Sequence, residues 1–286
     1  MYAFINNEIL PVSKATVHVS DLALHRGYGI FDFFKISDGH VFFLDAYLDR
    51  FFNSASIMRL PVPLDRKVIV QNIYRLIEKN ALHQSGIKMI LTGGYSPDGY
   101  HIAKPNLIMT HHNLVLPGQD VVQEGVRIIT HDYVREFAHA KTINYTMGIW
   151  LGDKMRQAEA ADVLYKKGDL VSEFPRCNFF IVRKDNTVVT ARENVLSGIT
   201  RGNVLRIAGE HFRAEERDLH ISEVFDAKEA FLTSTTKRIV PIVEVDGRSI
   251  GTGKPGDVSL TLLDKLLELE KRDQKENPYP KKFYGF

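Results

Sequence analysis

The sequence contains a single cysteine, Cys177, among its 286 residues, and it has no long apolar run. One cysteine cannot form an internal disulfide, which fits a reducing compartment. No stretch approaches the ~18 consecutive apolar residues that are typical of a membrane-spanning helix. The N-terminus MYAFINNEIL also lacks the basic and apolar regions of a signal peptide. We therefore expect a cytoplasmic protein without a membrane partner.

An excess of charge of one sign is missing as well. The chain has 37 lysine and arginine residues against 35 aspartate and glutamate residues, so its net charge is only +2. Proteins that bind nucleic acid usually show a marked basic patch or excess, so a nucleic-acid partner is disfavoured. The hydrophobic content of 44% is ample for large cores, and small molecules are the expected partners.

The local patterns divide the chain into two domains. Residues 1–112 alternate between strand-like and helical patterns, and residues 113–122 contain Pro-Gly without a clear period. We predict a linker at 113–122, a strand-rich C-terminal domain at 123–275 and a polar, proline-broken tail at 276–286. The predicted hairpins lie at 4–10, 30–44, 163–173 and 178–190, and the predicted helices at 44–58, 69–77, 200–212 and 260–272.

One lysine stands out by its surroundings. Lys141 lies in HAKTINYTMGIW, whose other residues around it are mostly small, apolar or hydroxyl-bearing. Burial favours the neutral amine of a lysine, and a neutral amine can form a Schiff base with a carbonyl, including the aldehyde of pyridoxal phosphate. Taken alone, the position equally suits a lysine that reaches solvent from a strand end.

Two other segments have the chemistry to bind a phosphate. Ser197-Gly198 leads into a helix predicted to begin near Thr200, and the N-terminus of a helix attracts anions. The segment LTSTT, residues 232–236, places four hydroxyl groups at the end of an apolar strand. Each segment alone is also typical of an ordinary threonine-capped helix or a solvated strand end.

Several segments taken in order resemble one enzyme family. They are VHVSDLALHRGYGIFDFFKI, YLDRFFNSA, KTINY, VSEFPRCNFF, and LSGITR with TSTTKRIVPI. Together they resemble the fold-type IV pyridoxal-phosphate enzymes, which include branched-chain aminotransferases, D-amino-acid aminotransferases and aminodeoxychorismate lyases. The resemblance runs from about residue 3 to residue 270. It implies an α+β fold of two domains, with pyridoxal phosphate in the cleft between them, and a homodimer.

The resemblance also implies roles for single residues. Lys141 matches the Schiff-base lysine, which also moves a proton during the reaction. Glu173 matches the glutamate that pairs with the pyridine nitrogen, and Arg50 matches an arginine that binds the phosphate. The remaining residues that match cofactor contacts are Ile199, Thr200 and Thr235 for the phosphate and Tyr145 near the ring hydroxyl.

The match is weakest where substrate is chosen. Asp98 stands where typical D-amino-acid aminotransferases place a carboxylate-binding arginine, and an aspartate repels a carboxylate. Arg176 follows Glu173 where small residues are common. We hypothesise that Arg176 and Arg26 bind the substrate carboxylate instead, although both could be structural arginines in ion pairs. The other predicted substrate contacts are Phe31, Ser234 and Thr236.

The implied reaction is a ping-pong transamination from a D- or branched-chain-type amino acid to a 2-oxo acid. Aminodeoxychorismate lyase, which would release pyruvate with the same lysine, is the alternative within the fold. A binding protein that kept the fold without catalysis is the alternative outside it. No metal site is expected, because the adjacent His111 and His112 point to opposite faces of a strand.

Overall fold

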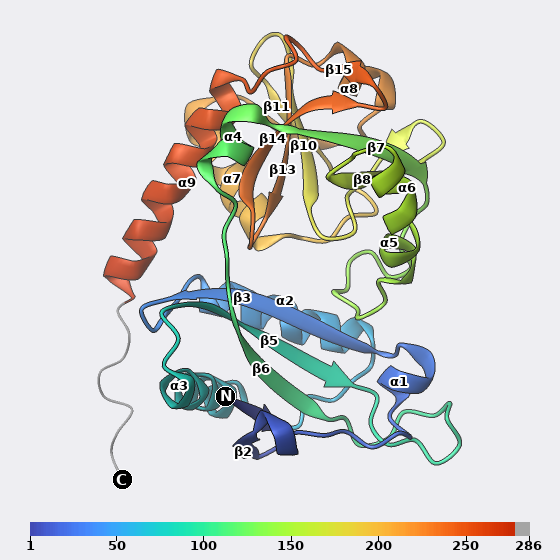
Figure 1. Cartoon of the computed structure of the whole chain (residues 1–286), viewed down its shortest axis with the longest axis vertical. Helices are drawn as coiled ribbons and strands as arrows, with labels where there is room; N and C mark the ends of the chain where they lie inside the picture. The colour runs from blue at the N-terminus through green and yellow to red at the C-terminus, as the bar shows by residue number, and fades with distance from the viewer. Residues whose placement is uncertain (278–286) are drawn as a thin grey trace. The chain divides into compact units, whose positions relative to one another are not determined.

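A computed structural model of the chain describes residues 1–277, which form two compact units (Figure 1). Of these residues, unit 1 contains 1–115, 140–144 and 271–277, and unit 2 contains 116–139 and 145–270. The short segment 140–144, which includes Lys141, therefore belongs to a different unit from the residues on either side of it.

Unit 1 is built on an antiparallel sheet with the strand order β2-β1-β6-β5-β3-β4. Both predicted hairpins of this unit are confirmed. The first turns at Asn6-Asn7, and the second turns at Asp38-Gly39, where both residues have positive φ angles as tight hairpin turns require. The strands are β1 (Tyr2–Ile5), β2 (Glu8–Pro11), β3 (Gly29–Ser37), β4 (His40–Val41), β5 (Gln84–Thr92) and β6 (Leu107–Asn113).

Two long helices cover this sheet and confirm the predicted helical periods. Helix α2 (Leu44–Ile57) packs against β3, and α3 (Arg66–Asn80) packs against β1 and β6. Their buried residues recur at helical spacing, so each helix presents one apolar face to the sheet. Unit 1 also contains a 3-10 turn at Val12–Lys14 and the short helix α1 (Leu22–Arg26).

Unit 2 contains a mixed sheet with the order β12-β11-β10-β13-β14-β7-β8-β9, and β15 pairs with β14. The two ends of this strand order are also joined. Val171 N on β9 donates a hydrogen bond to Leu219 O, shortly after β12, at 2.8 Å. The strands are β7 (Val126–Asp132), β8 (Asp162–Lys167), β9 (Leu170–Val171), β10 (Asn178–Val182), β11 (Val188–Ala191), β12 (Ala214–Arg217), β13 (Glu229–Ser234), β14 (Arg238–Val245) and β15 (Arg248–Ser249).

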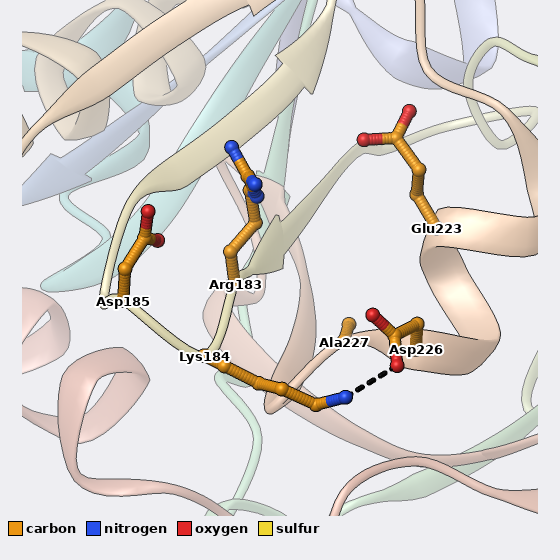
Figure 2. A pocket seen from close by; sticks show the side chains of 6 residues that line it. All are labelled: Arg183, Lys184, Asp185, Glu223, Asp226 and Ala227. Atoms are coloured by element: carbon orange, nitrogen blue, oxygen red, sulfur yellow. Dashed lines mark hydrogen bonds and ion pairs between the residues drawn. The ribbon is translucent and has the colours of Figure 1, made fainter.

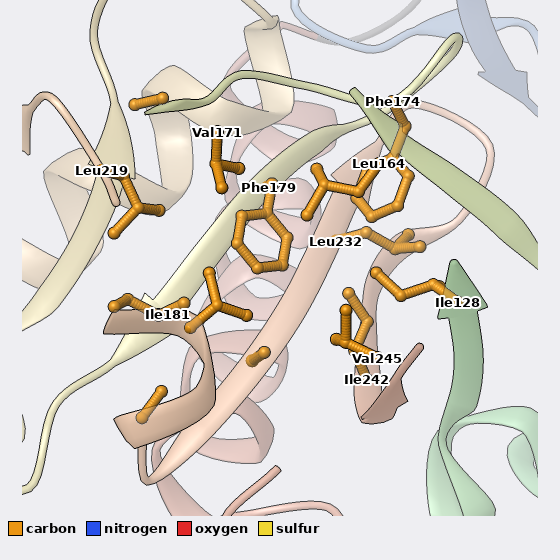
Figure 3. Packing of buried hydrophobic residues seen from close by; sticks show 14 of the residues in the cluster. Ile128, Leu164, Val171, Phe174, Phe179, Ile181, Leu219, Leu232, Ile242 and Val245 are labelled. Carbon is orange, nitrogen blue, oxygen red and sulfur yellow. The ribbon is translucent and has the colours of Figure 1, made fainter. Parts of the chain in front are cut away.

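A large apolar cluster fills the space enclosed by these strands (Figure 3). Phe174 and Phe179 meet edge to face in it, with ring centroids 5.9 Å apart. Cys177 is buried in the same cluster, and burial raises the pKa of its thiol to about 11, which disfavours the reactive thiolate. The hairpins predicted at 163–173 and 178–190 are confirmed as β8–β9 and β10–β11.

The helices of unit 2 pack outside the sheet. Helices α7 (Ile199–His211) and α9 (Asp257–Glu276) confirm the predicted helices, and a second apolar cluster lies between them and β10, β11, β13 and β14. The remaining helices are α4 (Gln119–Glu124), α5 (Thr146–Trp150), α6 (Gly152–Gln157) and α8 (Ile221–Asp226).

The end of α9 belongs to unit 1. There Asp273 accepts a hydrogen bond from Phe43 N at 3.1 Å and pairs with His40 Nε2 at 2.8 Å. Of the predicted tail 276–286, residues 278–286 lie outside the described part of the chain. No helix within residues 1–277 is both long and apolar enough to cross a membrane.

Candidate active site

The main chain of Lys141 is held on both sides within unit 1. Its N–H donates to Ser54 Oγ on α2 at 3.1 Å, and its carbonyl accepts from Phe31 N on β3 at 2.9 Å. The segment continues along β3, because Ile143 N donates to Gly29 O at 3.1 Å. Lys141 Nζ lies 4.8 Å from the centre of the Phe31 ring. The structure thus brings two predicted site residues together.

Arg50 lies on α2, and only 8% of it is exposed. Its guanidinium makes a two-point contact with Asp32 on β3, with Nε 2.9 Å from Oδ2 and Nη2 2.6 Å from Oδ1. Asp32 is fully buried. Asp32 stands among aromatic residues in a strand, and no pattern in the sequence marks it as the partner of Arg50.

Glu173 of unit 2 is a buried carboxylate with several donors. Arg135 Nε donates to Oε1 at 2.8 Å, while Asn178 Nδ2 and Leu196 N donate to Oε2 at 3.2 and 2.9 Å. Both members of the ion pair are nearly buried, since the exposed fractions of the Arg135 and Glu173 side chains are 10% and 4%. A carboxylate that accepts this many hydrogen bonds is stabilised as the anion.

Arg135 was not predicted from the sequence. Burial by itself lowers the pKa of an arginine, but the attraction and hydrogen bonds of Glu173 outweigh that effect and raise the pKa of Arg135 above its usual value. Its Nη2 also donates to Ala138 O at 2.8 Å. The arginine therefore stays charged, and it links the segment that leads to Lys141 with Glu173.

Asn178 connects Glu173 to the start of α7. Its Nδ2 donates both to Glu173 Oε2 and to Leu196 O, at 3.2 and 2.9 Å. A Cβ atom at Gly198, the N-cap of α7, would lie 2.1 Å from Asn178 Oδ1, so this close approach requires glycine. The helix begins at Ile199 and Thr200, close to the predicted start, and Glu173 and the helix N-terminus share one anchoring residue.

The hydroxyl-rich segment meets the same anchor. Thr233 on β13 pairs with Asn178 on β10. The Thr233 hydroxyl is buried, and within residues 1–277 it has no hydrogen-bond partner. Ser234 ends the strand, and its Oγ accepts from Lys237 N at 3.1 Å, which closes the turn that contains Thr235 and Thr236. Tyr145 precedes α5 and is partly exposed.

The two arginines proposed for substrate recognition are exposed. Arg26 ends α1 and donates from Nη1 to His25 O at 3.3 Å. Arg176 lies in the tight turn closed by a hydrogen bond from Phe174 N to Cys177 O. Within the described residues neither guanidinium makes an ion pair, so the structure gives no support there to a salt-bridged structural role.

Asp98 shapes its own loop. It accepts hydrogen bonds from Ser96 Oγ and from the main-chain N–H groups of Tyr100 and His101, and it contacts the His101 ring. The hydrogen bonds from His101, main chain first, lower the pKa of Asp98 below its usual range. This carboxylate therefore remains an anion at the position where a substrate-binding arginine would stand in typical D-amino-acid enzymes.

Two surface cavities of unit 2 do not include any predicted site residue in their lining. One, of about 360 Å³, is bounded by Val134 and Ser172, the neighbours of Arg135 and Glu173 in sequence. The other, of about 280 Å³, has a mostly charged lining from the β10–β11 turn and the end of α8, where Lys184 and Asp226 pair (Figure 2). Within residues 1–277 no group of three or more His, Cys, Asp or Glu side chains is placed to hold a metal ion.

A buried anion braced by an arginine, a helix N-terminus and a lysine fixed beside an aromatic ring are the parts expected of a pyridoxal-phosphate enzyme. The sequence matches the family model for class IV amino-transferases over residues 29–245, which is well over half of the chain. The chain belongs to the class IV aminotransferases.

The comparisons with individual proteins agree. A branched-chain-amino-acid aminotransferase of Pseudomonas aeruginosa is 30% identical over 281 residues, which cover 92% of this chain and 91% of that protein. A D-alanine aminotransferase of Bacillus licheniformis is 26% identical over 266 residues, covering 91% and 93%. The solved T.th. branched-chain amino acid aminotransferase with pyridoxamine 5'-phosphate superposes with a TM-score of 0.89 at 24% identity, covering 97% and 96%.

These findings confirm the predicted family, the α+β fold class, the aminotransferase activity and pyridoxal phosphate as the cofactor. The relatives are named as aminotransferases, so the lyase alternative gains no support from them. The roles of single residues stay predictions.

Proposed function

We propose that this aminotransferase acts on D-amino acids or branched-chain-type amino acids, with Lys141 as the residue that carries pyridoxal phosphate. The observation that carries the proposal is the environment of Glu173, a buried anion held by Arg135, Asn178 and Leu196 N. Such an anion suits the pyridine nitrogen of the cofactor, and a protein without this chemistry has no need to bury it.

The described residues fit the cofactor in two further respects. Gly198 allows the close approach of the main chain at the start of α7, and that helix is 13 residues long, so its N-terminal N–H groups form a developed anion site. The buried Thr233 hydroxyl, without a partner in residues 1–277, fits a polar group that the chain does not supply.

When bound, pyridoxal phosphate supplies an electron sink for the bond that breaks at the substrate Cα. Glu173 supports this by keeping the pyridine nitrogen protonated, and Arg135 supports Glu173 by keeping it ionised. Lys141 would hold the cofactor through its amine and, once that amine is free, would act as the base that moves the Cα proton of the substrate. The main chain of Lys141 is hydrogen-bonded on both sides, so it stays in place while the side chain that carries Nζ can move.

We assign the phosphate to Arg50, the main chain of Ile199, the hydroxyl of Thr200 and Thr235. A guanidinium suits this role because it offers several N–H donors in a fixed plane. Tyr145 is assigned to the ring hydroxyl. The support for these assignments is the start of α7 at Ile199 and the burial of Arg50 against Asp32.

We assign the substrate carboxylate to Arg26 and Arg176, whose guanidinium groups make no ion pair within the described residues. Phe31 is assigned to the substrate side chain because it lies beside Lys141 Nζ. Ser234 and Thr236 complete the proposed set.

A homodimer in the cytoplasm is the proposed setting. Unit 1 exposes Val19, Leu24 and Tyr100 by 67%, 68% and 76%, and large exposed apolar side chains are typical of surfaces that meet another protein. The single cysteine is buried and packed, which suits a reducing compartment. Sedimentation or light scattering measures the oligomeric state directly.

A panel of D- and L-amino acids with pyruvate or 2-oxoglutarate tests the substrate class. We expect a 2-oxo acid product from the preferred donor, and no dependence on aminodeoxychorismate. Borohydride reduction of the loaded enzyme followed by peptide mapping should place the cofactor on Lys141. A cofactor mapped to any other residue contradicts the assignment.

Lys88 offers a matched control for Lys141. Its Nζ lies 5.7 Å from the centre of the same Phe31 ring, against 4.8 Å for Lys141. We expect Lys141→Ala to lower kcat by about 10⁴-fold or more, because the variant loses both the covalent anchor and the proton carrier. Lys88→Ala should keep the activity within about 3-fold.

A further inference from the structure

Strand β3 buries a charge in an otherwise apolar row. Side chains alternate along a strand, so Ile30, Asp32, Phe34 and Ile36 share one face, and each of the four is 0% exposed. Three members of the row are hydrocarbon and one is a carboxylate. A buried carboxylate is strongly unfavourable unless a cation and hydrogen bonds compensate it, so Asp32 is retained for what it contacts.

Asp32 accepts a hydrogen bond from Phe33 N at 2.8 Å and pairs with Arg50 in a specific geometry. The two hydrogen bonds occupy Nε and one side of Nη2 of the guanidinium. A guanidinium has five N–H groups in one plane, so the other three, two on Nη1 and one on Nη2, point along edges turned away from Asp32. The Arg50 Cζ atom also lies 5.3 Å from the centre of the Tyr47 ring. The plane of the guanidinium is thereby fixed.

We propose that Asp32 acts as the resident counter-ion of Arg50 and compensates the charge of this buried arginine before the cofactor phosphate arrives. The inference rests on the proposed phosphate role of Arg50. A cation at 8% exposure needs an anion in its neighbourhood, and in the cofactor-free protein Asp32 provides one from within the same unit. After loading, the phosphate is a second anion.

This role predicts an unequal effect of one substitution. Asp32→Asn keeps the shape but removes the charge, and the Nδ2 group faces an N–H group of Arg50 instead of accepting from it. Removing one partner of a buried ion pair is strongly destabilising because the other charge loses that compensation. In the loaded protein the phosphate compensates Arg50, so the loss is smaller there. By linkage, the cofactor then stabilises the variant more than the parent.

The experiment is thermal unfolding of the full chain, cofactor-free and saturated with pyridoxal phosphate. For Asp32→Asn we expect the rise in Tm on saturation to exceed that of the parent by about 5 °C. Pyridoxal, which lacks the phosphate, should give no such excess, and inorganic phosphate should give part of it. Ile36→Val, in the same buried row, is the control and should lower both forms equally. Equal losses in both forms of Asp32→Asn would overturn the proposal.

Binding titrations keep the proposal apart from the assignment on which it rests. Arg50→Met should weaken pyridoxal phosphate about 10-fold or more and leave pyridoxal unchanged. If it changes neither, the phosphate role of Arg50 is wrong. If Arg50→Met behaves as expected but Asp32→Asn binds pyridoxal phosphate more weakly than the parent, only the counter-ion role is wrong.

If Asp32→Asn does not fold, a second comparison of variants still tests the proposal. Arg50→Met leaves Asp32 buried without its cation, and the double variant Asp32→Asn with Arg50→Met removes both charges. If the two residues form a functional ion pair, the cofactor-free double variant should unfold at a higher temperature than Arg50→Met alone. A lower or equal temperature contradicts the proposal.

Discussion

The two units each bury an arginine against a carboxylate, Arg50 on Asp32 in unit 1 and Arg135 on Glu173 in unit 2. Both contacts use Nε and Nη2, at 2.9 and 2.6 Å in unit 1 and at 2.8 and 2.7 Å in unit 2. The proposed roles are reversed. In unit 1 the arginine meets the cofactor and the acid supports it, whereas in unit 2 the acid meets the cofactor and the arginine supports it.

This difference shows that the same kind of buried ion pair can present either a positive or a negative side chain to a ligand. A phosphate calls for a cation and a protonated pyridine nitrogen calls for an anion, and the same ion pair supplies either one. In these proposed roles the supporting partner does not contact the ligand, so its loss should be repaired by any group that restores the charge. The next substitutions test that distinction.

The largest effect is expected at Glu173. Glu173→Gln keeps the size and one acceptor but removes the negative charge that we propose to lie next to the pyridine nitrogen. We expect kcat to fall about 100-fold or more, because the nitrogen is no longer held protonated. Steady-state kinetics and the absorbance spectrum of the loaded enzyme measure this. An unchanged kcat would remove Glu173 from the mechanism.

A smaller effect on kcat is expected at Arg135, which pairs with Glu173. Arg135→Met leaves Glu173 buried without a cation, which should destabilise the fold by about 3 kcal/mol and lower kcat about 10-fold. Arg135→Lys is the matched control and should recover most of kcat. If the lysine variant is as poor as the methionine variant, the role of Arg135 is more than charge support.

The next prediction concerns Arg176, which belongs to neither of the two buried ion pairs. Arg176→Ala should raise KM for 2-oxo acids about 10-fold and leave the affinity for pyridoxal phosphate unchanged, because the side chain is exposed and no ion pair within residues 1–277 involves it. Arg183→Ala, which removes an exposed arginine from the charged cavity of unit 2, is the control. Equal KM values in the Arg176 variant and the parent would withdraw the carboxylate assignment.

The last prediction concerns stability alone and a buried pair without charge. His111 of unit 1 contacts Ser85 Oγ at 2.8 Å, and burial lowers the pKa of His111 to about 4. The unfolded chain therefore binds a proton near pH 6.5 that the folded chain does not bind, so stability is full above that pH and falls as the pH drops toward 4. Between pH 7 and pH 5 the free energy of unfolding should fall in the parent, and it should fall by on the order of 2 kcal/mol less in His111→Gln. Denaturant unfolding at the two pH values measures this difference.

The resemblance in the sequence singled out one member of each pair, Arg50 and Glu173, but not its partner. Asp32 and Arg135 are 18 and 38 residues away from their partners in sequence and become their neighbours only through the fold. No local pattern marks such a partner. The segment that leads to Lys141, which contains Arg135, has neither a helical nor a strand period.

The fold was predictable where a pattern repeats. The four hairpins and the long helices α2, α3, α7 and α9 follow alternation, turn residues or helical spacing. The helices that were not predicted have five or six residues, which is too short for a period to show; they are α1, α4, α5, α6 and α8.

The chain passes between the units at residues 115–116, 139–140, 144–145 and 270–271. Neither unit is therefore one continuous stretch of the sequence. Expressing either unit alone would require its segments to be joined in a new way. A split after residue 115 would give a first piece without Lys141 and a second piece with the lysine but without Ser54 and Phe31, its main-chain partners. Complementation of two such fragments would restore the lysine only if the second piece threads its five-residue insert back into the first.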